Sequence, residues 1–235
     1  MLEPFLSKEG TTKISFKTAL DEMLMGGLET KTITQLYGPP ASGKTNLCLL
    51  AAVRCVQQGR KVIFIDTEGG HSIERLKQIA GAKPKDVLEK IYFYEPACFS
   101  DQQFIIDNLD YMMSHDIGLV ILDSAVAFYR HERNDENAAE LNKALASQLS
   151  RLSSLARKYN LAVIITTQVY SSYDSENTVE PVGGSVLKYW SKVVIELKKE
   201  GRDIEAVLVR HRELPEGLKT RFRITDDGIE TVERR

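Results

Sequence analysis

Short apolar runs alternate along the chain with longer stretches in which apolar residues recur at helical spacing. Residues 119–123 open with four apolar residues in a row, and residues 161–168 are similar. Continuous rather than alternating apolarity is typical of strands covered on both faces, as in a parallel sheet. Further short strands are predicted at residues 33–37, 61–66 and 91–94.

Helices are predicted between these strands. The apolar residues of 138–159 trace one face of a long helix. Shorter helices are expected at residues 16–25, 47–52, 72–80 and 101–113. The alternation of strand and helix predicts an α/β fold with a mostly parallel central sheet and helices on both faces.

The carboxyl-terminal part of the chain has a different pattern. Residues 170–183 are polar and lack periodicity, so a mobile loop is predicted there. The strands predicted beyond it are joined by short turns, which indicates an antiparallel extension of the sheet. These strands are residues 193–197, 204–209, 221–224 and 229–232.

One stretch matches a phosphate-binding motif, the P-loop pattern G-x-x-x-x-G-K-[ST], at every specified position. It comprises Gly38, Pro39, Pro40, Ala41, Ser42, Gly43, Lys44, Thr45 and the following Asn46. Bare glycines let backbone N–H groups curl around phosphate oxygens, and the helix behind them adds its positive end. Lys44 is expected to reach the β and γ phosphates and Thr45 to ligate Mg²⁺. ATP with Mg²⁺ is therefore the expected cofactor.

Three further polar residues end predicted strands, and open α/β sheets bind ligands at the carboxyl ends of their strands. Asp123 follows an apolar run and fits the acid that holds the Mg²⁺. Glu68 is placed to orient or deprotonate the attacking water, although an acid near a helix start is favourable in any case. Gln168 could hydrogen-bond the γ-phosphate, or it could be an ordinary strand-end amide.

Composition and charge limit the partners. With 43% hydrophobic and 27% charged residues and a net charge of -2, the chain lacks an overall basic footprint, so any nucleic-acid contact must be local. The last third gathers cations, but interleaved acids make a mixed, solvated surface the expected outcome for most of them. Cys48 and Cys55 are expected to be buried thiols, and Trp190 a core residue. The four histidines show no metal-ligand spacing.

The sequence shows no targeting or membrane signal. No apolar run is long enough to span a bilayer, and the N-terminus lacks the basic and apolar regions of a signal peptide. A cytoplasmic protein without a membrane partner is therefore expected.

Several blocks of the sequence, in order, resemble RecA-type recombinases of the archaeal and eukaryotic branch. Beyond the P-loop, these blocks are residues 65–70, 119–124 followed by Tyr129-Arg130, 165–169 and 181–184. The resemblance covers nearly the whole chain from about Ile14 and implies a RecA-like P-loop NTPase core.

The resemblance also implies a domain organisation. A tail of residues 1–13 is expected to precede one RecA-like ATPase domain over residues 14–235. The helix-hairpin-helix domain that precedes the core in the recombinase RadA is missing, which indicates a short archaeal paralogue.

Roles for single residues follow from the same resemblance. Glu68 is similar to the family's catalytic glutamate, Gln168 to its γ-phosphate sensor, and Arg75 to the arginine that lies against the adenine. Arg130 and residues 131–137 occupy the place of the first DNA-binding loop, and residues 171–183 that of the second.

Both loops are short and poor in cations. Arg130 and Arg133 are offset by acids in the first loop. In the second, Tyr170 and Tyr173 could stack on bases or pack within the loop. Efficient strand exchange is not expected, because it needs positive charge and stacking surfaces along the strand.

One match is read as coincidence. Residues 16–19 match the letters of the Phe-x-x-Ala plug of filament-forming relatives. They lie in the first predicted core helix, so long filaments are not expected.

The resemblance thus implies an ATP-binding, DNA-binding accessory protein of homologous recombination and DNA repair, with a weak Mg²⁺-dependent ATPase. Expected partners are single-stranded or branched DNA bound with modest affinity, the recombinase RadA or a branched-DNA nuclease, and a weakly associated second copy. Two alternatives stay open. One is a DNA-stimulated strand-exchange recombinase, and the other is a nucleotide-dependent scaffold without DNA affinity.

Overall fold

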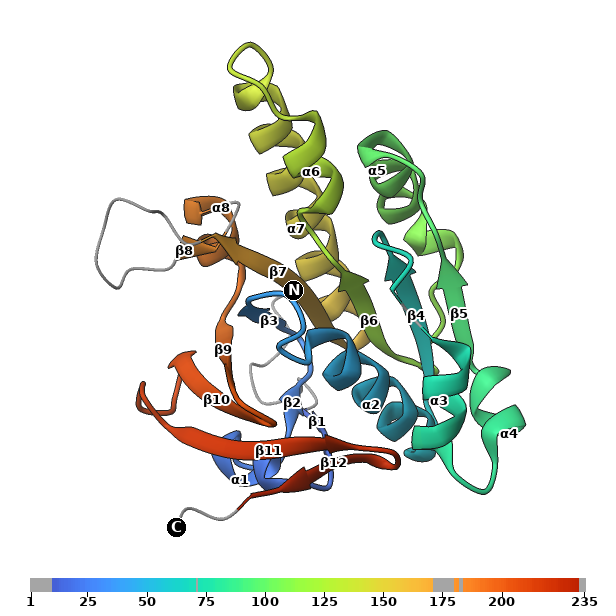
Figure 1. Ribbon diagram of the computed structural model, residues 1–235. Coiled ribbons are helices and arrows are strands. Elements are labelled where there is room, and N and C mark those ends of the chain that lie inside the picture. Colours follow the sequence, from blue (N-terminus) through green and yellow to red (C-terminus); the bar gives the residue numbers. More distant parts are fainter. Residues whose placement is uncertain (1–9, 71, 171–179, 182–183, 233–235) are drawn as a thin grey trace.

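A 10-stranded sheet forms the centre of the protein in a computed structural model that describes residues 10–70, 72–170, 180–181 and 184–232 (Figure 1). The strand order is β12-β11-β10-β9-β3-β7-β6-β4-β5, and β8 pairs with β7. Neighbouring strands from β9 to β5 run parallel, whereas β10, β11 and β12 run antiparallel. The predicted mostly parallel sheet with an antiparallel extension is confirmed.

Every predicted strand is present, and three short strands, β1, β2 and β8, were not predicted. In chain order they are β1 Lys13–Ile14, β2 Leu28–Glu29, β3 Ile33–Gly38, β4 Lys61–Asp66, β5 Ile91–Tyr94, β6 Ile117–Asp123, β7 Ala162–Tyr170, β8 Glu180–Pro181, β9 Val193–Glu200, β10 Asp203–Arg210, β11 Lys219–Thr225 and β12 Gly228–Thr231. The short strands β1 and β2 form a separate antiparallel pair.

The helices lie between and beside these strands. In chain order they are α1 Ala19–Met23, α2 Lys44–Gln57, α3 Ile73–Ala80, α4 Pro84–Leu88, α5 Phe99–Asp107, the 3₁₀ helix η2 Leu109–Tyr111, α6 Ala127–Glu132, α7 Ala138–Tyr159 and α8 Gly184–Trp190. No described helix is long and apolar enough to cross a membrane.

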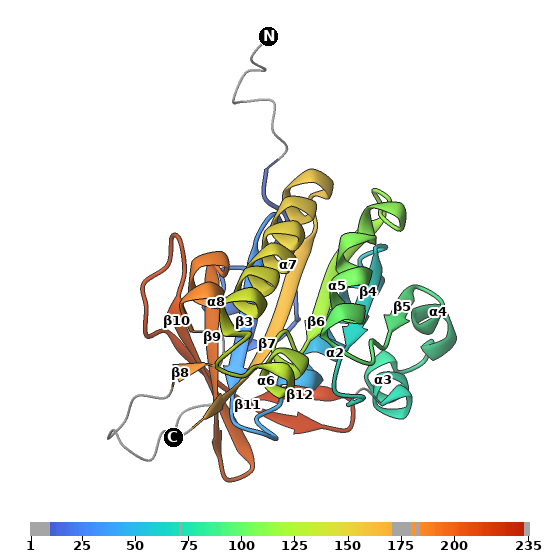
Figure 2. The ribbon, with the colours of Figure 1, turned by 90° about the horizontal axis from the view of Figure 1, so that it is seen from above.

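Two helical layers cover the sheet, which is why its strands are apolar without alternation. Val62 and Phe64 pack against the layer that contains α2, whereas Ile63 and Ile65 face the layer that contains α5 and α7. Figure 2 shows α5 and α7 side by side. Since both faces of β4 are buried, an alternating pattern would have left polar groups in a core.

The first predicted helix is shorter than expected. The α1 helix begins after its cap, Thr18, rather than at Phe16, because the carboxylate of Asp21 accepts hydrogen bonds from the backbone N–H of Phe16 and of Lys17, both at 2.7 Å. These bonds hold the preceding residues outside the helix. Phe16 is instead buried in the core.

The helix predicted over residues 101–113 is shifted and divided. It begins at Phe99, whose N–H donates to the Glu132 carboxylate at 2.8 Å. It ends at Asp107, because the side-chain amide of Asn108 donates to the Phe104 carbonyl at 2.8 Å, and η2 follows. The first of these contacts joins residues 33 positions apart, so local periodicity does not reveal it.

Part of the expected first loop is helical. The α6 helix includes Arg130 and His131, and the Tyr129 hydroxyl donates to Asn142 of α7 at 2.7 Å. Figure 1 shows that the turn between α6 and α7 projects away from the sheet. The stretch predicted as a mobile loop, residues 170–183, lies mostly outside the described residues, although Tyr170 ends β7 and residues 180–181 form β8.

The expected burial of the thiols is confirmed, but that of the tryptophan is not. Cys48 and Cys55 are fully buried, and burial raises the pKa of Cys55 to about 12. Trp190 is only partly buried, because it ends α8 at the edge of the layer formed by α5 and α7.

The core on the α7 side provides a test of the fold. Leu149→Ala is expected to lower the free energy of unfolding by about 2–5 kcal/mol, because the side chain is fully buried and its loss leaves a cavity. The matched control is Lys143→Ala, at an exposed position on the same helix. It should change the free energy of unfolding by less than about 0.5 kcal/mol. Urea unfolding measures both, and equal midpoints for the two variants would contradict this packing.

Candidate functional site

The P-loop turns between β3 and α2 at two positions that have no room for a side chain. A Cβ on Gly38 would lie 2.4 Å from the Leu197 carbonyl oxygen of β9. A Cβ on Gly43, where φ is +89°, would lie 2.8 Å from the Ile204 Cδ1 of β10. The antiparallel extension therefore lies against the loop. At Gly38 the obstacle is backbone, so only glycine fits, whereas at Gly43 the obstacle is the end of the Ile204 side chain and the positive φ is what favours glycine.

Lys44 is the first residue of α2, and its ammonium lies over the loop. Its Nζ donates to the carbonyls of Gly38 at 3.0 Å and of Pro39 at 2.9 Å. Burial lowers the pKa of Lys44, and the negative charges of Asp123 and Glu68 oppose this shift. A cation here, at the positive end of a helix, is suited to an anion with several oxygens such as a phosphate.

Asp123 ends β6 beneath this lysine and is only 6% exposed. Its carboxylate accepts hydrogen bonds from the hydroxyls of Thr166 and Thr45. Burial raises the pKa of Asp123, and these two hydrogen bonds oppose the shift. A buried carboxylate beside a hydroxyl offers the oxygen ligands that Mg²⁺ prefers.

A hydrogen-bonded relay joins β4, β7 and α6. The Gln168 side-chain amide donates to both carboxylate oxygens of Glu68, at 3.1 and 3.2 Å. In turn, its carbonyl accepts a hydrogen bond from the Arg130 guanidinium at 3.2 Å. We call Glu68, Gln168 and Arg130 the relay.

Two cavities meet at the relay. One of about 200 Å³ is lined by residues of the P-loop from Pro40 to Asn46, together with Asp123, Glu68 and Gln168. The other, of about 380 Å³, is lined by Thr67, Glu68, Ala127, Phe128, Arg130, His131 and Gln168. Because Glu68 and Gln168 line both, a ligand in either cavity can alter the same hydrogen bonds.

Comparison with known proteins adds to this geometry. The sequence matches the Rad51 family over residues 11–232. The chain belongs to the Rad51 family. It is 42% identical over 228 residues to the DNA repair and recombination protein RadB of Methanobrevibacter smithii, covering 94% of this chain and 97% of the relative. It is 43% identical to the protein of the same name from Methanosphaera stadtmanae, covering 92% and 94%.

A solved structure supports the same placement. The crystal structure of the RadB recombinase superposes with a TM-score of 0.82 at 39% identity, covering 94% of this chain and all of that one. The predicted RecA-like fold and the predicted resemblance to a short archaeal paralogue are both confirmed.

Arg75 of this Rad51-family chain lies beside the P-loop and joins three elements. Its guanidinium donates to the Asn46 side chain of α2 at 2.8 Å and to two backbone carbonyls of the β11–β12 turn, Asp226 at 2.8 Å and Gly228 at 3.0 Å. Burial lowers its pKa, and nearby Asp226 and Asp227 oppose that shift. Its contact with an adenine stays a prediction.

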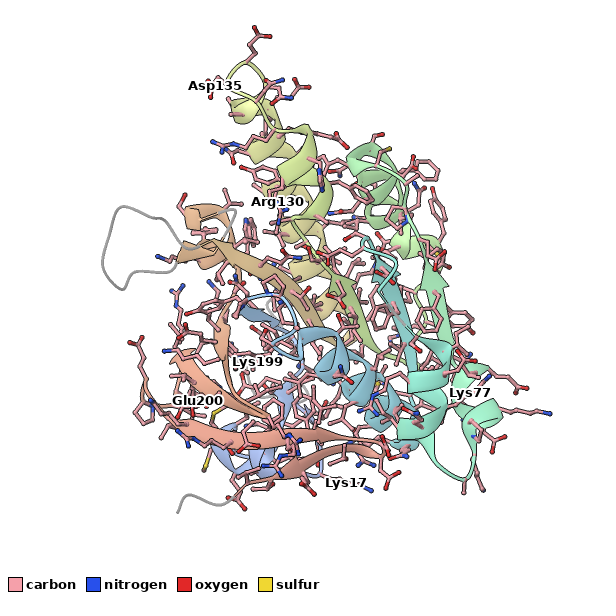
Figure 3. All side chains as sticks on the ribbon, in the orientation of Figure 1. Lys17, Lys77, Arg130, Asp135, Lys199 and Glu200 are labelled. Carbon is pink, nitrogen blue, oxygen red and sulfur yellow. The ribbon has the colours of Figure 1, made fainter. Side chains whose placement is uncertain are left out.

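Of the expected DNA-binding residues, the structure describes the side chains of Arg130 and Arg133 only. Figure 3 labels Arg130 at the base of α6 and Asp135 at the outer tip of the α6–α7 turn. Arg133 is exposed at the end of α6. Only the backbone of Tyr170 is described, and Tyr173 lies outside the described residues.

Two residues that support this Rad51-family site are missing from the sequence-based predictions. Thr166 holds the Asp123 carboxylate, and the Thr67 hydroxyl accepts from the Ser124 N–H at 2.8 Å and donates to its carbonyl at 2.9 Å. Alternation along β7 places Thr166 on the same face as Gln168, a signal that the sequence does contain.

Among the described residues, no three His, Cys, Asp or Glu side chains are grouped so as to hold a metal ion. A cation in this site would therefore be held by Thr45, Asp123 and oxygen ligands from outside the chain.

Gly43 before α2 and Gly59 after it both have positive φ, so they allow the P-loop contact to be tested. Gly43→Ala and Gly59→Ala should each lose about 1–2 kcal/mol of unfolding free energy from left-handed backbone strain. Gly43→Ala should lose about 1–3 kcal/mol more, because its Cβ meets Ile204, whereas nothing lies within 4 Å of a Cβ at Gly59. Thermal or urea unfolding measures the difference, and equal losses would show that Ile204 does not restrict the loop.

Proposed function

We propose that this Rad51-family chain is an ATP-binding accessory protein of homologous recombination and DNA repair. It binds ATP with Mg²⁺, hydrolyses it slowly, binds single-stranded or branched DNA with modest affinity, and modulates a recombinase such as RadA or a nuclease that cleaves branched DNA. It does not itself catalyse efficient strand exchange. The names of its RadB relatives, DNA repair and recombination proteins, support this role.

One observation carries the nucleotide part of the proposal. The P-loop, Asp123, Glu68 and Gln168 come from four different strand ends and line a single cavity of about 200 Å³. The donors fit a triphosphate, since the loop supplies a helix N-terminus and the Lys44 ammonium, and glycine leaves the backbone bare at Gly38 and Gly43.

The residues divide the chemistry between them. Thr45 and Asp123 would hold Mg²⁺, which would supply positive charge to the phosphates. Lys44 would turn from the loop carbonyls to the phosphates. Glu68 orients or deprotonates the attacking water, and Gln168 bonds the γ-phosphate.

The relay supports slow hydrolysis. Both oxygens of the Glu68 carboxylate accept hydrogen bonds from Gln168. Glu68 therefore has to exchange these bonds before it can accept a proton from water.

The segment at the first DNA-binding position supports modest DNA affinity. Glu132 is held by the Phe99 N–H, and Arg130 is bonded to Gln168. The exposed Arg133 precedes a turn with the two acids Asp135 and Glu136. Few cations in this segment are thus available to phosphates, as strand exchange would require.

The alternative of a DNA-stimulated recombinase has one observation in its favour. Arg130 belongs to the segment expected to meet DNA and also bonds Gln168, which bonds Glu68. DNA that withdrew Arg130 would therefore change the hydrogen bonds of the catalytic carboxylate.

ATP turnover with and without single-stranded DNA tests the proposal. We expect a slow rate that DNA changes by less than about threefold, a difference of under 1 kcal/mol in the barrier. A rate raised by a factor of about 100 or more would establish the recombinase alternative. In a separate titration with DNA, an affinity that does not fall as salt rises would instead favour the scaffold without DNA affinity.

Two substitutions separate binding from chemistry. Lys44→Ala should weaken ATP binding about 10- to 100-fold, because it removes charge-assisted hydrogen bonds to phosphate. Glu68→Gln should keep binding and slow hydrolysis about 100-fold or more, as expected for a lost general base. Calorimetry and a phosphate-release assay measure the two effects. Glu74→Gln, an exposed acid on α3, is the control, and an unchanged rate in Glu68→Gln would place the base elsewhere.

The affinity for Mg²⁺–ATP should depend on pH. Burial raises the pKa of Asp123, and a proton on this carboxyl must leave before Mg²⁺ can bind. Affinity should therefore fall as pH decreases through that raised pKa and be constant above it. Titration calorimetry at several pH values measures the trend, and Asp123→Asn should bind weakly with a flatter profile. An equally steep profile in Asp123→Asn would show that another group titrates.

A further inference from the structure

The α8 helix carries an exposed aromatic ring among cations. Tyr189 is 67% exposed, and its ring meets that of Trp190 edge-on, with centroids 5.2 Å apart. The Lys192 ammonium lies 5.5 Å from the Tyr189 ring centroid and donates to the Tyr189 carbonyl at 3.1 Å. We call Lys188, Tyr189, Lys192 and Arg210 the α8 patch.

The α8 patch is held in place from two sides. Trp190 packs against the core layer formed by α5 and α7. The Arg210 guanidinium, at the end of β10, donates to the Lys188 carbonyl and so ties β10 to α8. The exposed ring of Tyr189 therefore stands on a supported backbone.

The cations of the α8 patch differ from those of the neighbouring strands in their ion pairing. On β9, β10 and β11, Lys198 pairs with Glu196, Lys219 with Glu205, Arg221 with Glu200 and Glu205, and Arg223 with Asp203 and Glu230. Among the described residues, neither Lys192 nor Arg210 forms an ion pair, and both are exposed. The α8 patch thus joins two exposed cations, outside these described ion pairs, to an exposed aromatic ring.

We propose that the α8 patch binds single-stranded nucleic acid, with one base stacked on Tyr189 and the flanking phosphates beside Lys192 and Arg210. A single strand presents both an unstacked base face and phosphates, the two groups that this patch complements. The proposal rests on the proposed DNA-binding function and gives it a site outside the α6 segment. That site lies on the helix that follows β8, a strand paired to the end of β7.

The chain carries its own reporter for this site, because Trp190 is its single tryptophan. The full chain is titrated with a fluorescently labelled oligothymidine of about 20 nucleotides. Anisotropy of the label reports binding anywhere, and Trp190 emission reports binding at α8. We expect Trp190 emission to change along the same isotherm as the anisotropy, since a stacked base quenches nearby indole.

Substitutions identify the groups involved. Tyr189→Ala should weaken binding about 5- to 100-fold, as for one lost stacking contact, whereas Tyr189→Phe should bind normally. Lys192→Gln should reduce the slope of log affinity against log salt by about 0.7, the value for one phosphate contact on a single strand. The controls are Tyr111→Ala, an 89% exposed tyrosine on η2, and Lys77→Gln on α3, which should leave both quantities unchanged.

The outcomes distinguish a failure of the α8 patch from a failure of the proposed DNA-binding function. A normal anisotropy change, unchanged Trp190 emission and an unchanged affinity of Tyr189→Ala would together show that DNA binds elsewhere. They would overturn binding at the α8 patch and leave DNA binding by the chain intact. No anisotropy change at any salt would overturn DNA binding and the α8 patch together. Equal competition by a duplex of the same length would overturn the stacking of an unpaired base. Circular dichroism confirms that each variant is folded.

Discussion

The parallel register of four strands is the constraint on which the site depends. Gly38 of β3 pairs with Gln168 of β7, and Asp66 of β4 pairs with Asp123 of β6. Because parallel strands end at the same edge, residues separated by up to 130 positions come together there. The two helical layers bury both faces of these strands and so hold the register.

At this edge the charged groups interact electrostatically, and some of them are also joined by hydrogen bonds. The charges of Asp123 and Glu68 raise the pKa of Lys44 against the effect of burial, and the charge of Glu68 raises the pKa of Asp123. The relay extends the same network from Glu68 to Arg130 and the second cavity. The relay thereby connects the predicted phosphate site with α6.

Charge is distributed unevenly over a chain whose net charge is only -2. The described cations of β11 are paired with acids on adjacent strands, and such cross-strand pairs leave little potential at the surface. Among the described residues, Lys192 and Arg210 form no such ion pair; Lys192 lies beside the exposed ring of Tyr189, and Arg210 donates to the Lys188 carbonyl. The mixed surface expected from the sequence is therefore seen at the paired cations of β11, and the α8 patch differs from it.

The sequence by itself determined the elements whose cause is local. Apolar runs defined β4, β6 and β7, and the P-loop glycines and the acid that ends β6 predicted a nucleotide site, because periodicity and turn chemistry act over a few residues. Only the tertiary structure decided where α5 begins, since its first N–H is bonded to Glu132. It also decided that Arg130 bonds Gln168, that Thr166 holds Asp123 and that Trp190 lies at a layer edge. Each of these depends on a contact between elements far apart in the chain, which no local pattern records.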